Sequence, residues 1–318
     1  MIDEKKVIDQ ISAQFADTGS APFLQRIGDD CAVRSVDGGY HLYSADVLVE
    51  NVHFSHSYMT LFEIGRKTAA VNISDIAAMG GIPDSLTIQL VCPPIENLAD
   101  AIKELYSGIH ELCETYQITL AGGDLSRGPC WVIACSIVGT QNTRVVYREG
   151  ATIGDELWVT GTPGLSSLGF DILQRHGRIK AEKLAPHAVR AHVSPSPQVK
   201  AGQLLAACHD VHAMIDVSDG IAKEARLLSN SCGKGACIYV PSTIKKKLQH
   251  PESLQAPEHY FLSGGEDYEL LFATAPGFIP PPEVSCMQIG HIIDTPGIFQ
   301  IDGTPWQESP WDHFSGEA

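Results

Sequence analysis

The chain has 318 residues, of which 44% are hydrophobic and 19% are charged, a composition typical of a globular protein with two domains. Its formal net charge of −16 at pH 7 argues against nucleic acid or an anionic membrane surface as the main partner. No apolar run reaches the roughly 20 residues of a membrane span, and the charged start Asp3-Glu4-Lys5-Lys6 does not resemble a signal peptide. Nine cysteines without a Cys-x-x-Cys pair favour free thiols. We therefore expect a cytoplasmic protein.

The pattern of apolar residues over the first 146 positions predicts an α+β domain with helices on one face of a sheet. In chain order, we expect a helix at 4–16, strands at 28–33 and 40–49, a helix at 61–79, a strand at 84–92, a helix at 97–116 and a strand at 131–138.

A single charge, Asp75, lies in the otherwise small and apolar run from Thr68 to Pro83. The alanines of this run favour helix and the glycine pair 80–81 ends it, so Asp75 falls in the last two turns, on the same face as Asn72. A carboxylate in such a helix needs hydrogen bonds, a cationic partner or a metal ion. The alternative is a purely structural, hydrogen-bonded aspartate.

The segment Gly122-Gly123-Asp124 predicts a glycine-rich turn with a carboxylate at its apex. Glycines allow the backbone to approach a ligand closely and expose amide groups to it. An ordinary turn can have the same composition, so this segment alone does not define a site.

The pattern restarts after a domain boundary near residue 147 and predicts a second, α/β domain. We expect a strand at 156–160, a helix at 166–176 whose first amides can hold an anion, helical segments between 180 and 209, a strand at 212–217, a helix at 221–229, a strand ending at 274 and a strand at 287–292.

Acidic residues mark two junctions of this second half. Asp216, Ser218 and Asp219 lie where a strand passes into a helix, a place where ligands commonly bind in α/β layers, although Asp219 can equally be a helix cap. Glu266 follows Gly264-Gly265 in a second glycine-led acidic turn, which can also be a simple hairpin or bulge.

Seven aspartates share a position at a turn or at the end of an element, mostly without a neighbouring cation in sequence. They are Asp29, Asp30, Asp46, Asp75, Asp124, Asp216 and Asp219. Such hard oxygen ligands suit magnesium, which lets an acidic protein bind a polyphosphate. No Gly-x4-Gly-Lys-Ser/Thr loop and no His-Arg-Asp catalytic loop occurs, so the phosphate site is of another kind.

Several motifs, in the same order, closely resemble the thiamine-monophosphate kinase family. They are Gly28-Asp-Asp-Cys-Ala-Val, Lys67-Thr-Ala-Ala-Val-Asn-Ile-Ser-Asp-Ile-Ala-Ala-Met-Gly, Gly122-Gly-Asp, Arg148-Glu-Gly-Ala, Val159-Thr-Gly-Thr-Pro-Gly, Ile215-Asp-Val-Ser-Asp-Gly and Ser263-Gly-Gly-Glu-Asp-Tyr-Glu-Leu. The Asn-Ile-Ser-Asp and Gly-Gly-Glu-Asp-Tyr-Glu blocks are the specific ones. The parent superfamily includes aminoimidazole ribonucleotide synthetase.

This resemblance implies an N-terminal domain, residues 1–146, that binds ATP and magnesium and pairs its sheet across a homodimer, and a C-terminal domain, residues 147–318, that closes the cleft. Carried over by position, the implied metal ligands are Asp30, Ser44, Asp46, Asp75, Asp124, Asp216 and Asp219. The implied nucleotide contacts are Gly123, Asp124, Arg148 and Ser218, and the implied catalytic set is Asp75, Asp124, Arg148, Asp216 and Asp219. His53, Glu266 and Trp311 are implied on the substrate side.

One block departs from the family pattern. Where the family usually has Ser-Thr-Asp-Thr, this chain has Ser44-Ala45-Asp46-Val47, so a metal contact there must use a backbone carbonyl, Ser44 or Asp46. An aromatic residue so near the terminus as Trp311 can also serve only to anchor the tail.

The resemblance implies ATP-dependent phosphorylation of thiamine monophosphate to thiamine diphosphate, with several magnesium ions. Two alternatives stay open: another ATP-dependent reaction of the same superfamily, or a nucleotide-binding protein without turnover.

Overall fold

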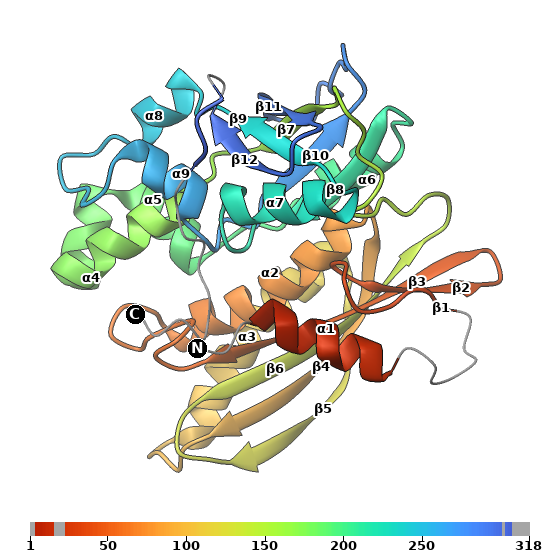
Figure 1. The fold of residues 1–318 in the computed structure, drawn as a ribbon. Helices are drawn as coiled ribbons and strands as arrows, with labels where there is room; N and C mark the ends of the chain where they lie inside the picture. Colours follow the sequence, from red (N-terminus) through yellow and green to blue (C-terminus); the bar gives the residue numbers. More distant parts are fainter. Residues whose placement is uncertain (1–3, 16–22, 301–302, 307–318) are drawn as a thin grey trace.

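The computed structural model describes residues 4–15, 23–300 and 303–306, and its strands form two six-stranded sheets, one in each half of the sequence (Figure 1). This mixture of helices and strands around two sheets confirms the fold class expected from the sequence. The expected boundary near residue 147 lies between the last strand of the first sheet and the first strand of the second.

The first sheet has the strand order β1-β2-β3-β6-β4-β5, in which only the pair β4 and β5 is parallel. Its strands are β1 (Phe23–Gln25), β2 (Ala32–Val36), β3 (Gly39–Val49), β4 (Ile82–Cys92), β5 (Thr119–Arg127) and β6 (Val132–Gln141), and its helices are α1 (Glu4–Gln14), α2 (Leu61–Ala78) and α3 (Leu98–Tyr116). Helix α2 lies between this sheet and the second half of the molecule (Figure 1).

Helix α2 starts at a capping box, in which Thr60 and Glu63 satisfy each other's backbone amides. Most of its residues are buried, and two glycines explain how α3 packs so closely against it. A Cβ atom on Gly65 would lie 1.9 Å from the Leu105 carbonyl oxygen, and one on Gly108 would lie 1.9 Å from the Phe62 carbonyl oxygen. Only glycine permits this backbone-to-backbone contact.

The prediction of a glycine-rich turn at Gly122-Gly123-Asp124 is wrong, because these residues lie inside strand β5. Gly123 pairs with Ile88 of β4, and a Cβ atom at that position would lie 2.0 Å from the Ile88 carbonyl oxygen. The glycine therefore allows two strands to approach each other and does not form a turn.

The second sheet has the order β12-β9-β11-β7-β10-β8, in which only the pair β9 and β12 is parallel. Its strands are β7 (Glu156–Thr160), β8 (Val211–Asp216), β9 (Gly235–Ile238), β10 (Leu270–Thr274), β11 (Cys286–Ile293) and β12 (Gly297–Gln300), and its helices are α4 (Leu165–Leu184), α5 (Pro186–Val193), α6 (Val199–Ala206), α7 (Ile221–Ser231), α8 (Ser242–Leu248) and α9 (Pro257–Ser263). The sequence did not predict β9, β12, α8 or α9.

The anion expected at the start of α4 comes from the protein itself. The amides of Gly164 and Ser166 donate to the two carboxylate oxygens of Asp267, at 2.6 and 3.1 Å. This helix end is therefore occupied by a side chain of the loop between α9 and β10, which it holds in place.

The two halves meet along α2. A Cβ atom on Gly202 of α6 would lie 2.1 Å from the carbonyl oxygen of Ala77, so α6 crosses the last turn of α2 in direct backbone contact. Nearby, the Ser74 hydroxyl donates to Asp216 of β8 at 2.7 Å. In the described part of the chain, no helix is long and apolar enough to cross a bilayer.

Candidate functional site

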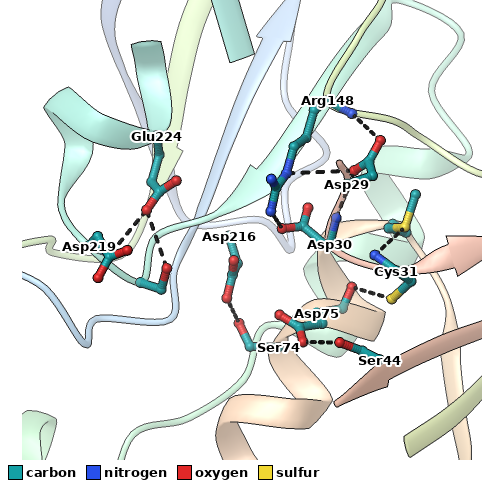
Figure 2. A network of polar contacts seen from close by, with 12 residues as sticks. Asp29, Asp30, Cys31, Ser44, Ser74, Asp75, Arg148, Asp216, Asp219 and Glu224 are labelled. Atoms are coloured by element: carbon teal, nitrogen blue, oxygen red, sulfur yellow. Dashed lines mark hydrogen bonds and ion pairs between the residues drawn. The ribbon is translucent and has the colours of Figure 1, made fainter. Parts of the chain in front are cut away.

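Three carboxylates from distant parts of the sequence come together at this contact between the halves (Figure 2). Asp30 lies just before β2, Asp75 in the last turn of α2, and Asp216 at the end of β8. One oxygen of each lies within 4.8 Å of the others. The predicted ligands Asp30, Asp75 and Asp216 therefore form one cluster, called here the carboxylate cluster.

Hydrogen bonds fix the orientation of the carboxylate cluster. The Ser44 hydroxyl of β3 donates to Asp75, the Ser74 hydroxyl donates to Asp216, and the Arg148 guanidinium donates to Asp30 at 2.5 Å (Figure 2). The Oδ2 atom of Asp30 is buried without a hydrogen-bond partner.

The charge of the carboxylate cluster is not balanced by the protein. Burial raises the pKa of Asp30, Asp75 and Asp216, and the charges of neighbouring carboxylates raise the pKa of Asp75 and Asp216 further. Arg148 lowers the pKa of Asp30, but burial outweighs it. A bound cation would remove this repulsion.

The residues present fit magnesium. The donors are carboxylate and hydroxyl oxygens, which this ion prefers, and the orphaned Oδ2 atom of Asp30 lacks the partner that a cation would supply. No histidine or cysteine sulfur belongs to the set of three, so a zinc or copper site is not indicated.

Asp46 lies beside the carboxylate cluster, on strand β3. Its backbone amide donates to Asn72 at 3.2 Å, and its pKa is raised by burial and then by the charges of Asp219 and Asp30. A hydrogen bond with Asp75 acts in the opposite direction. Asp46 thus adds a fourth carboxylate at the edge of the cluster.

Arg148 is the cation next to the cluster. Its backbone amide donates to Asp29 at 3.1 Å, and its guanidinium pairs with both Asp29 and Asp30. Burial lowers the pKa of Arg148, but these two carboxylates raise it overall, so the side chain stays charged. Arg148 is held where an anionic ligand of the cluster would meet it.

The strand-to-helix junction after β8 is organised by Glu224, which the sequence analysis did not identify. Glu224 accepts hydrogen bonds from the Asp219 amide at 3.0 Å and from the Ser218 hydroxyl at 3.3 Å (Figure 2). Burial and the charge of Asp219 raise the pKa of Glu224 to about 8. Asp219 is not the helix cap, since Gly220 has that position and Asp219 pairs with Lys223 at 2.6 Å.

His53 and Glu266, expected on the substrate side, are joined by a lysine that the sequence analysis also missed. The ammonium of Lys67 lies 2.6 Å from Glu266 Oε1 and donates to the His53 carbonyl at 3.1 Å. The available signal was a charge at the edge of the apolar run that contains Asp75.

Asp124 and Gly123 do not join the cluster within one chain. Strands β6 and β4 separate β5 from β3, and the pairing places Asp124 in a row with Gln89, Ala134 and Val47 on the sheet face opposite to Asp46. Three strand spacings correspond to about 14 Å. Trp311 lies outside the described residues.

The two departures from the family pattern lie at the surface of β3. Ala45 and Val47 are exposed, whereas Ser44 and Asp46 between and beside them face the cluster. The missing hydroxyls therefore leave the contacts of Ser44 and Asp46 intact.

The chain is similar to known proteins in both sequence and fold. Residues 28–141 match the family described as AIR synthase related protein, N-terminal domain. The chain is 34% identical over 282 residues to thiamine-monophosphate kinase of Synechococcus elongatus, with 84% of each chain covered. It is 32% identical over 295 residues to thiamine-monophosphate kinase of Aquifex aeolicus, covering 91% of this chain and 92% of the relative. A solved structure of AaThiL complexed with AMPPCP and TMP superimposes with a TM-score of 0.86 at 28% identity, over 99% of both chains.

Proposed function

Because the chain belongs to the thiamine-monophosphate kinase family, we propose that it transfers the γ-phosphoryl group of ATP to the phosphate of thiamine monophosphate, giving thiamine diphosphate and ADP. It is therefore a phosphotransferase. The observation that carries the proposal is the carboxylate cluster with Arg148 beside it, at the contact between the halves of a fold shared with a complex of AMPPCP and TMP.

We assign the magnesium ligands to Asp30, Ser44, Asp46, Asp75, Asp216 and Asp219, which lie in or next to the carboxylate cluster. When bound, magnesium neutralises phosphate charge and holds the phosphates of both substrates together. Ser44 and Ser74 orient two of the carboxylates, and Glu224 holds the Ser218 hydroxyl and the Asp219 amide in position for the nucleotide.

The reaction requires alignment more than chemical activation. The acceptor phosphate oxygen is already ionised at neutral pH, so no protein base has to remove a proton. Arg148 supplies a fixed positive charge for the transferred group, and the buried carboxylates keep it in place. Transfer then occurs directly between the bound substrates, which a chiral γ-thiophosphate donor would reveal as inversion at phosphorus. Retention, or protein phosphorylated by ATP alone, would contradict direct transfer.

The decisive experiment measures thiamine diphosphate formed by the purified protein from ATP, magnesium and thiamine monophosphate. Thiamine, which lacks the acceptor phosphate, is the matched control and should give no product. EDTA should abolish turnover. If ATP is consumed equally with and without thiamine monophosphate, another reaction of the superfamily is favoured, and if ATP binds without any consumption, the chain is a binding protein.

We also propose that the protein works as a homodimer, with residues 1–146 as the ATP-binding and dimerisation domain and residues 147–318 closing the cleft. Strand β5 pairs only with β4 in the described structure, and all nine of its residues are exposed. An uncovered edge strand of this length is a surface that a second subunit can cover.

A dimer also explains the place of Asp124. A groove of about 320 Å³ lies between α3 and β5 and is lined by Tyr106, Ile109, Ile118 and Leu120, among others. We propose that this groove takes the base of ATP, and that the phosphates, together with Asp124 on the other face of β5, reach the carboxylate cluster of the partner subunit. ATP would then bridge two copies of the chain.

The nine cysteines support a reducing, cytoplasmic location. None of the nine forms a disulfide in the described structure, and five are buried.

A further inference from the structure

Lys67 is a fully buried lysine in the interior of α2. Its side chain is 0% exposed, although a buried ammonium is costly unless it is paired. Its partners are Glu266 Oε1 at 2.6 Å and the carbonyl oxygen of His53 at 3.1 Å. One ammonium group therefore connects residues that come from opposite halves of the chain.

Each partner of Lys67 has a further hydrogen bond that fixes its position. The amide of Glu266 donates to the Ser218 carbonyl at 2.6 Å, and Glu266 has a φ of 65°, a conformation that costs energy in a residue other than glycine. The ring of His53 accepts a hydrogen bond from the Val49 amide at 3.0 Å. Lys67 completes this arrangement by fixing the Glu266 side chain and the His53 turn at the same point.

The Glu266 carboxylate is fixed but still reachable. Its side chain is 28% exposed, whereas those of Lys67 and His192 are at most 3% exposed. His192 Nδ1 lies 3.3 Å from Glu266 Oε2 and 3.2 Å from the Ser166 hydroxyl. Two buried side chains, Lys67 and His192, thus contact the Glu266 carboxylate, while part of the Glu266 side chain remains exposed.

The charges support an ionised carboxylate at this point. Burial raises the pKa of Glu266, but Lys67, the largest opposing influence, helps to bring it below its usual value. Burial and then the Lys67 charge lower the pKa of His192 to about 3, so that this ring is neutral at pH 7 and contributes a hydrogen bond. Lys67 is therefore the cation that keeps Glu266 charged.

We propose that Lys67 is a positioning residue of the acceptor site, which sets the place and the charge of Glu266 and the place of His53 for binding the thiamine moiety. This inference rests on the proposed function and on the place of His53 and Glu266 on the substrate side that the family resemblance implies. An ionised carboxylate suits the cationic thiazolium ring and the aminopyrimidine amino group, and the 28% exposure of the Glu266 side chain leaves it accessible to such a ligand.

The test uses Lys67→Met, Glu266→Gln and the double variant Lys67→Met/Glu266→Gln in the full-length protein with ATP and magnesium. The Michaelis constants for thiamine monophosphate and ATP, kcat and the melting temperature are measured for each. Binding of thiamine monophosphate in the presence of AMPPCP is measured by calorimetry, so that the inference does not depend on turnover. Lys245→Met, which removes the cation of the exposed Lys245–Glu258 pair, is the matched control.

We expect Lys67→Met to raise the Michaelis constant for thiamine monophosphate about tenfold and to change the Michaelis constant for ATP by no more than about twofold. Lys67→Met should also lower the melting temperature, because it leaves Glu266 unpaired. The double variant should regain stability, because it has no uncompensated charge. Its Michaelis constant for thiamine monophosphate should stay raised, at the value found for Glu266→Gln alone.

Other results would distinguish a failure of the Lys67 inference from a failure of the proposed function. If the double variant regains both stability and normal acceptor affinity, or if Lys67→Met changes only the melting temperature, Lys67 is structural and the inference is overturned while the proposed function stands. If the unmodified protein neither binds nor phosphorylates thiamine monophosphate, the proposed function is overturned and the inference with it.

Discussion

At the scale of single residues, the site consists of charges that the fold brings together against their mutual repulsion. Asp75 shows this best, since Ser44 donates to it and the carboxylates of Asp46, Asp216 and Asp30 all raise its pKa. A protein that needed only a structural hydrogen bond at this position could use asparagine, which has the same shape and no charge. The charge of Asp75 is thus a cost to the fold that a bound cation would offset.

The first prediction concerns this charge. We expect Asp75→Asn to reduce kcat at least about 100-fold, because a ligand for magnesium is lost, while the metal-free protein keeps or gains stability. Activity assays and thermal unfolding without metal measure the two effects. Asp100→Asn, an exposed aspartate in the first turn of α3, is the control and should change neither. Near-normal rates for Asp75→Asn at ordinary magnesium would make Asp75 a structural residue.

The second prediction concerns pH. Burial, followed by the charge of Asp30, raises the pKa of Asp29 from 3.8 to about 7, and the carboxyl groups of the cluster shift in the same direction. A raised pKa in the folded state means that the folded protein binds protons more tightly, so this stabilisation is complete below the unfolded pKa and is lost as pH rises through the folded pKa.

The metal-free protein should therefore lose stability between about pH 4 and pH 8, with a melting temperature about 5 °C lower at pH 8 than at pH 6. Magnesium should reverse this loss, with the larger gain at pH 8. Calorimetric melting at both pH values, with EDTA and then with magnesium, measures the difference. An equal effect of magnesium at both pH values would contradict the role of the cluster.

The sequence revealed those site residues whose signal is local. Asp30, Asp75 and Asp216 each stand at the end of an element, where a charge is conspicuous, and the fold brings all three together. Glu224 and Lys67 gave a weaker signal, because Glu224 lies in the first turn of a helix, Lys67 lies within another helix, and the fold determines which groups each contacts. Their roles depend on contacts between elements, which spacing along one element cannot show.

At the scale of elements, α2 determines the geometry of the site. It carries Asp75 and Ser74 in its last turns and Lys67 in its middle, and it packs on the first sheet, on α3 and on the second half. Its own position depends on the two glycine contacts with α3. The sequence predicted this helix well because its alanines favour helix and a glycine pair ends it, whereas the short β9 and β12 carry no comparable signal.

The third prediction tests the glycine contact. Gly108→Ala places a methyl group where the Phe62 carbonyl oxygen lies, so the two helices must separate, and we expect a loss of about 1 to 3 kcal/mol of stability. Displacement of α2 should also weaken magnesium binding. Denaturant unfolding and metal titration measure both effects. Ser107→Ala, on the exposed side of the same helix, is the control, and equal behaviour of the two variants would refute the packing argument.

At the scale of the whole molecule, the single chain lacks one predicted ligand. Asp124 lies on the opposite face of the first sheet from the cluster, on an edge strand with no covering neighbour in the described structure. If Asp124 acts in catalysis, it does so in the site of another subunit. The sequence predicted Asp124 as one of the site acids but carried no information about which subunit it would serve.

The fourth prediction follows from this arrangement. Asp75→Asn and Asp124→Asn should each be inactive, but co-expression of the two should restore about a quarter of the unmodified activity, since half of the dimers are mixed and each has one intact site. Asp30→Asn with Asp75→Asn is the control and should restore nothing, because both residues serve the same cluster. Light scattering should show a dimer throughout. No restoration with Asp124→Asn, or an active monomer, would contradict the bridging site.

The direct backbone contact between Gly202 of α6 and Ala77 of α2 has a consequence for how such a protein can evolve. Because this contact lies within one helical turn of Asp75, any side chain at position 202 would shift this proposed metal ligand. The sequences of the two halves therefore cannot change independently of each other at this contact. A substitution on one side of the α2–α6 contact would require a compensating substitution on the other side. A chimera that joins the halves of two distant relatives should therefore contain all the proposed ligands and still bind magnesium poorly.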